Sequence, residues 1–126
     1  MILLDTHTLL WAFFQKDNIP EQTQKLIEET EGVFVSIASL WEIAIKQSIG
    51  KLNLKCSIED IVCICHEEGI DILQIRAEHL DMIKSLPMVH NDPFDRLIIS
   101  QAIVDDLSVI SKDHVFANYD IKLIWK

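Results

Sequence analysis

Met1-Ile2-Leu3-Leu4-Asp5 is the stretch that decides the fold: four consecutive apolar residues are followed by a carboxylate. A short apolar run without polar alternation is typical of a strand that is buried on both faces of a parallel sheet. A helix is expected next, because apolar side chains dominate the residues up to Phe14. The start of the chain therefore predicts a strand–helix unit with an acid at the junction.

The same unit recurs along the chain. Further strands are predicted over 33–36, 70–75 and 107–111, with a last one at the sheet edge over 121–125. Helices are predicted between them, marked by Pro20, Gly32, Gly50, Ser57 and Gly69 as starts or ends, and by Asn91 or Asp92 as a cap before Pro93. The alternation predicts one domain over 1–126, a three-layer α/β/α sandwich around a mainly parallel five-stranded sheet.

Composition sets limits on the class of protein. The 126 residues are 49% apolar, enough for a core, and no apolar stretch is long enough to span a bilayer. The N-terminus lacks the basic start of a signal peptide, and Cys56, Cys63 and Cys65 lack disulfide spacing, so a cytoplasmic protein with reduced thiols is expected. A net charge of −9 argues against non-specific nucleic-acid binding but suits a basic protein partner.

Four acids follow predicted strands or open predicted helices: Asp5, Glu42, Asp95 and Asp113. Ligands of open parallel sheets bind at the carboxyl ends of the strands. Clustered carboxylates resist ionising together unless a cation joins them, and oxygen ligands favour Mg²⁺ or Mn²⁺. The joint placement of the four predicts a divalent metal site.

Each acid also has a purely structural interpretation. Asp5 and Asp95 suit helix N-termini, and Asp113 suits a turn. Glu42 matches a capping box with Ser39 and an i,i+4 ion pair with Lys46. His90 is expected to be structural, and the pair Asp105-Asp106 is interpreted as a solvated helix end.

The chain resembles PIN-domain nucleases over essentially its whole length, and among them the VapC-type toxins of toxin–antitoxin pairs. The resemblance rests on these segments: Leu3-Leu4-Asp5-Thr6-His7, Ser39-Leu40-Trp41-Glu42-Ile43-Ala44-Ile45-Lys46, Gly50-Lys51-Leu52, Asp92-Pro93-Phe94-Asp95-Arg96-Leu97-Ile98-Ile99-Ser100-Gln101-Ala102 and Ser111-Lys112-Asp113. The block from Asp92 to Ala102 is the most specific.

The resemblance implies a strand order of 3-2-1-4-5 and an acidic site for Mg²⁺ or Mn²⁺. Matched by motif, the catalytic and metal-binding acids are Asp5, Glu42, Asp95 and Asp113. Four further residues are implied to support them: Thr6, Asp92, Arg96 and Ser111. A Thr is common in the family where this chain has Ser111, so the hydroxyl is retained.

The implied activity is metal-dependent endoribonuclease cleavage by water, which leaves a 5′-phosphate and a 3′-hydroxyl. Transfer RNA or a ribosomal RNA loop is the implied substrate class. The implied partners are a second copy of the chain and a cognate antitoxin that places an Arg or Lys in the metal site.

Other functions remain open at the level of sequence. A catalytically silent PIN-like binding module would usually have lost one of the acids, and all four are present. A receiver-like phosphoacceptor domain should carry an Asp after its third strand, where this chain has Ile75-Arg76. A DNA-cutting enzyme of the same fold tends to carry extra helices, for which this chain has no room.

Overall fold

A five-stranded parallel sheet forms the centre of the computed structural model, which describes all 126 residues. The strands are β1 (Ile2–Leu4), β2 (Val33–Ser36), β3 (Ile70–Leu73), β4 (Ser108–Ile110) and β5 (Leu123–Ile124). Their order is β3-β2-β1-β4-β5, and every neighbouring pair is parallel. The predicted order and parallel sheet are confirmed, and all five carboxyl ends point to one edge.

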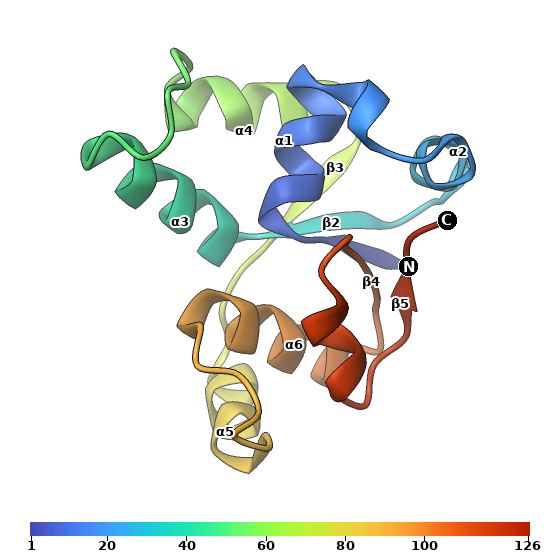
Figure 1. Cartoon of the computed structure of the whole chain (residues 1–126), viewed down its shortest axis with the longest axis vertical. Helices are drawn as coiled ribbons and strands as arrows, with labels where there is room; N and C mark the ends of the chain where they lie inside the picture. The colour runs from blue at the N-terminus through green and yellow to red at the C-terminus, as the bar shows by residue number, and fades with distance from the viewer.

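Helices cover both faces of the sheet (Figure 1). The elements are α1 (Thr6–Phe14), a 3₁₀ turn η1 (Lys16–Asn18), α2 (Glu21–Glu29), α3 (Ile37–Ser48), α4 (Ile58–Glu67), α5 (Ala77–Ser85), α6 (Pro93–Asp105) and a 3₁₀ turn η2 (His114–Asn118). The first four α-helices share one core with the sheet, while α5, α6 and η2 share the other. The structure is therefore the predicted three-layer α/β/α sandwich.

The central strand β1 supplies both cores. Ile2 and Leu4 pack with the helices of one face, and Leu3 packs with α6 on the other. All three are at most 4% exposed, because parallel strands in this architecture are covered on both faces. This explains why the run that opens the chain is apolar without alternation.

Several helix starts and ends differ from the predictions. The capping box expected at Ser39 is absent, because α3 begins three residues earlier and Ser36 caps it by accepting from the Ala38 amide. Pro20 is the residue before α2 rather than its first, and α2 ends at Glu29, before Gly32. Gly32 instead adopts φ +78° at the entry to β2, a left-handed conformation suited to glycine.

Other local predictions are confirmed. Ser57 and Asp60 form a capping box at α4, and Asp92 caps α6 with Pro93 at its first position. The third strand ends at Leu73 rather than at 75, and the fifth spans only Leu123–Ile124 rather than 121–125.

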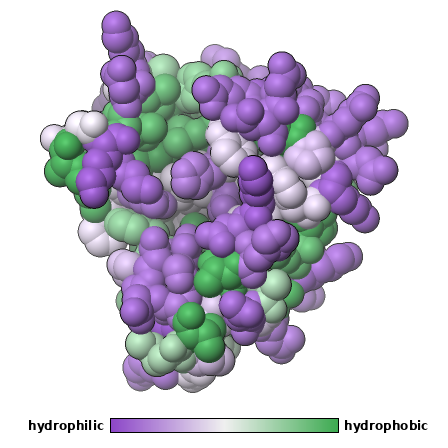
Figure 2. Space-filling model, viewed as in Figure 1, coloured by the Kyte–Doolittle hydropathy of each residue, from purple (hydrophilic) through white to green (hydrophobic).

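Hydrophilic side chains dominate the molecular face in Figure 2. None of the helices combines the length and apolarity that crossing a membrane requires.

Candidate functional site

Asp5 lies directly after the central strand and caps α1. Its Oδ1 accepts from the Thr8 amide at 2.8 Å, and its Oδ2 accepts from the Ser111 hydroxyl at 2.5 Å. Burial raises the pKa of this carboxyl, although the hydrogen bonds from Ser111 and Thr8 oppose that shift. The chain thus holds a nearly buried carboxyl in a fixed orientation at the end of β1.

Glu42 reaches the same edge of the sheet from α3. Thr6 donates to Glu42 Oε1 at 2.7 Å, and Lys46 Nζ lies 2.8 Å from Oε2. The predicted i,i+4 pair is confirmed, and the bond from Thr6 ties Glu42 to the residue that follows Asp5. Two separate elements, α1 and α3, therefore bring their polar groups to one place.

Asp95 lies in the first turn of α6. Burial raises its pKa to about 6, nearby Asp92 and Glu42 add to the shift, and the hydrogen bond from His90 opposes it. The influence of Glu42 places the α3 and α6 acids in one electrostatic environment. The packing of Trp41 against Phe94, with ring centroids 5.2 Å apart, joins the same two helices.

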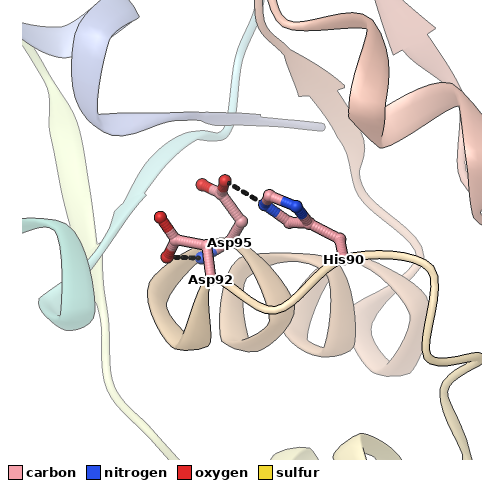
Figure 3. A group of neighbouring side chains, drawn as sticks. All are labelled: His90, Asp92 and Asp95. Atoms are coloured by element: carbon pink, nitrogen blue, oxygen red, sulfur yellow. Dashed lines mark hydrogen bonds and ion pairs between the residues drawn. The ribbon is translucent and has the colours of Figure 1, made fainter.

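His90 approaches Asp95 from the loop between α5 and α6, with 2.8 Å between Nε2 and Oδ2 (Figure 3). Asp92 lies beside them, and its Oδ1 accepts from the amides of Phe94 and Asp95. Ligand atoms of His90, Asp92 and Asp95 all lie within 4.8 Å of one another, a geometry that can hold a cation.

Arg96 forms no ion pair with the four acids. It is 9% exposed, and its guanidinium donates to the carbonyls of Pro87, His90 and Ile83. These bonds hold α5 and the loop that carries His90 against α6.

Asp113 is exposed at the end of the adjacent strand β4 and caps η2 by accepting from the Val115 amide at 3.0 Å. It lines a hollow of about 210 Å³ together with Asp5, His7, Trp11 and Lys112. The Asp113 amide donates to the Ser111 hydroxyl, which in turn donates to Asp5. Ser111 therefore links the acids that follow β1 and β4.

The four predicted acids gather at one edge but do not form a closed ligand set. No three of them have ligand atoms within 4.8 Å of one another, and each already accepts hydrogen bonds or an ion pair from the protein. Asp5 and Asp95, the two acids with raised pKa values, nevertheless offer oxygen donors that suit a hard divalent cation, which would stabilise their ionised form.

A family model described as the PIN domain matches residues 2–122. The chain belongs to the PIN domain family. PIN domains are nucleases in general, so the acidic edge lies where a nuclease site is expected. A comparison with curated protein sequences gave no significant match.

Solved structures share this PIN fold at low identity. The VapBC2 complex of Rickettsia felis, bound to a promoter DNA fragment, is similar with a TM-score of 0.75 and 18% identity, covering 100% of both chains. A toxin–antitoxin complex from Klebsiella pneumoniae has a TM-score of 0.67 and 14% identity, covering 98% of this chain and 96% of that one. FitAcB from Neisseria gonorrhoeae has a TM-score of 0.66 and 20% identity with the same coverage.

Sequence reasoning did not assign His90 to the site of this PIN domain. The structure places its Nε2 against the carboxyl of Asp95, so it contacts a predicted metal ligand. The spacing His-x-Asp-x-x-Asp over 90–95 was the available signal, because a helix cap brings the two acids together and the preceding loop folds the histidine back.

Proposed function

We propose that this PIN domain is an endoribonuclease that uses Mg²⁺ or Mn²⁺ to hydrolyse RNA phosphodiester bonds. The observation that carries the proposal is that two carboxyls at the carboxyl edge of the sheet, the buried Asp5 and the half-buried Asp95, both have raised pKa values. Burial disfavours the ionised form of these carboxyls, and a bound cation would stabilise that form.

Each residue has a defined role in this proposal. Asp5 and Asp95 hold the metal, and Glu42 and Asp113 complete its ligands directly or through water. Ser111 orients Asp5, and Thr6 and Lys46 orient Glu42, by the hydrogen bonds and ion pair described above. Such partners commonly change metal affinity or activity 10- to 100-fold when removed.

The bound metal would lower the pKa of a water and stabilise the charge that builds on the phosphate. Attack by water is therefore proposed, which leaves a 5′-phosphate and a 3′-hydroxyl.

The proposed setting is a toxin–antitoxin pair of the VapC type in the cytoplasm. The structural neighbours named above come from toxin–antitoxin complexes, and an acidic chain of net charge −9 suits a basic antitoxin segment. A second copy of the chain is proposed as a further partner, and transfer RNA or a ribosomal RNA loop as the substrate, since unpaired loops are the usual targets of specific recognition.

The decisive experiment is cleavage of transfer RNA and total RNA by the purified chain, with Mn²⁺, with Mg²⁺ or with EDTA. We expect metal-dependent cleavage that falls by at least about 100-fold in Asp5→Asn and in Asp95→Asn, because each variant loses a metal ligand. Asp17→Asn is the matched control, since Asp17 lies exposed on η1, and it should cut like the wild type.

Cleavage that persists in both site variants, or in EDTA, would contradict the proposal. A folded wild type that binds Mn²⁺ but cuts neither RNA sample would favour the silent binding module instead.

A further inference from the structure

A second hollow, of about 270 Å³, lies beside the acidic edge. Its lining includes Lys46, Lys51, Thr6 and His7 and is otherwise apolar. Thr6 also donates to Glu42, so one residue of the lining contacts one of the four acids. His7 lines this hollow and the one that contains Asp5 and Asp113, which makes the two hollows neighbours.

The chain builds this hollow by folding back on α3. The amides of Lys51 and Leu52 donate to the Lys46 carbonyl at 2.9 and 3.1 Å, and Gly50 allows the turn with φ +75°. Gln47 Nε2 then donates to the carbonyls of Leu54 and Cys56 at 3.0 and 2.8 Å. Lys51 is therefore fixed beside Lys46 by backbone bonds rather than carried on a free loop.

The charge of the hollow is opposite to that of the chain. The molecule has 20 acids, yet Lys51 forms no ion pair, and Lys46 pairs only with Glu42. Lys46 is thus already compensated, whereas Lys51 has no acidic partner in the chain, and an anion in the hollow would supply one. The hollow therefore suits an anion, and the neighbouring acidic edge suits a cation.

We propose that this hollow binds the RNA phosphate that neighbours the cleaved one, with Lys46 and Lys51 as its cations. The inference rests on the proposed ribonuclease function. An RNA strand that offers one phosphate to the acidic edge carries further phosphates beside it, and an acidic protein must hold them with local lysines. The apolar part of the lining suits the sugar that accompanies the phosphate.

The test uses the inactive parent Asp5→Asn and a fluorescent single-stranded RNA of mixed sequence, with affinity measured by anisotropy across a salt series. A lysine that contacts a phosphate contributes to the salt dependence of binding, with a slope of about 0.7 per contact on single strands. We expect the Lys51→Ala substitution, introduced into the Asp5→Asn parent, to weaken RNA binding several-fold at low salt. The slope of affinity against salt should fall by about 0.7. Lys51→Arg should restore both values.

Lys55→Ala is the matched control, because Lys55 is exposed on the same loop but outside the hollow, and it should leave affinity and slope unchanged. Inorganic phosphate serves as a competitor. If it weakens RNA binding by the parent but not by the Lys51→Ala variant, the anion bound in the hollow is a phosphate. If wild type cuts RNA while Lys51→Ala binds with the parent's affinity and slope, the phosphate site is wrong and the nuclease stands. If the parent binds no RNA, both the phosphate site and the proposed ribonuclease function are contradicted.

Discussion

At the scale of single residues, the acidic edge is costly to the fold. Asp95 has a pKa of about 6 instead of its usual 3.8, because burial and its acidic neighbours disfavour the charged form. Sequence identified Asp95 through its place in a helix turn, but burial and the contact with His90 depend on the loop from Pro87 to His90, which Arg96 holds. A pattern along one chain does not reveal such contacts.

The raised pKa predicts an effect on stability whose sign depends on metal. Above pH 6 the folded protein carries the unfavourable carboxylate of Asp95, so without metal Asp95→Asn should raise the Tm at pH 7.5 by a few degrees. Lowering the pH to 5 protonates the wild-type carboxyl in the folded state, so the difference should shrink. In Mn²⁺ the order should reverse, because only wild type keeps the ligand and gains stability from binding.

Differential scanning calorimetry in EDTA and in Mn²⁺, at both pH values, checks this reversal. A variant that is less stable than wild type in EDTA at pH 7.5 would show that Asp95 is a structural residue rather than a group held at a cost.

At the scale of elements, α5 and α6 are joined by a polar cluster around the buried His79. His79 is fully buried on α5, and its Nδ1 accepts from the Arg76 amide, so its Nε2 carries the hydrogen and donates to Asp105 at 3.1 Å. Asp105 also pairs with the Arg76 guanidinium at 2.6 Å. Asp105 and Asp106 do lie at the end of α6, as predicted, but Asp105 is half-buried and pairs with residues 26 and 29 positions away.

The cluster predicts a pH-dependent contribution to stability. Arg76, and less strongly His79, lower the pKa of Asp105 below 3.8, so the contribution is present above that pH and is lost as the pH falls further. Asp105→Asn should lower the Tm at pH 7, and the gap to wild type should close below about pH 4. Asp106→Asn is the matched control, because Asn tolerates its left-handed φ of 54°, and it should not lower the Tm.

Helix ends were predicted well where one side chain decides them and poorly where several compete. Ser57 and Asp92 begin helices as expected, because each is followed by residues that need its cap. At α3 both Ser36 and Ser39 match a cap. Ser36 is the cap because β2 ends there, which leaves Ser39 inside the helix with its hydroxyl oxygen 3.0 Å from that of Thr6.

At the scale of the whole molecule, the parallel sheet explains why distant acids meet. Asp5 follows β1, and Asp113 follows the neighbouring strand β4, so the sheet brings together residues 108 positions apart. The apolar strands made this edge predictable from sequence. The exact ligand set was not, because the position of α6 depends on how it packs against α3 and the sheet.

The most direct test of the account is a crystal structure with Mn²⁺, with the metal located by its anomalous scattering. We predict a Mn²⁺ ion about 2.0–2.3 Å from carboxylate oxygens of both Asp5 and Asp95, with Glu42 and Asp113 around it. An ion bound only by His90, Asp92 and Asp95, or no ion at the edge of the sheet, would contradict the proposed site.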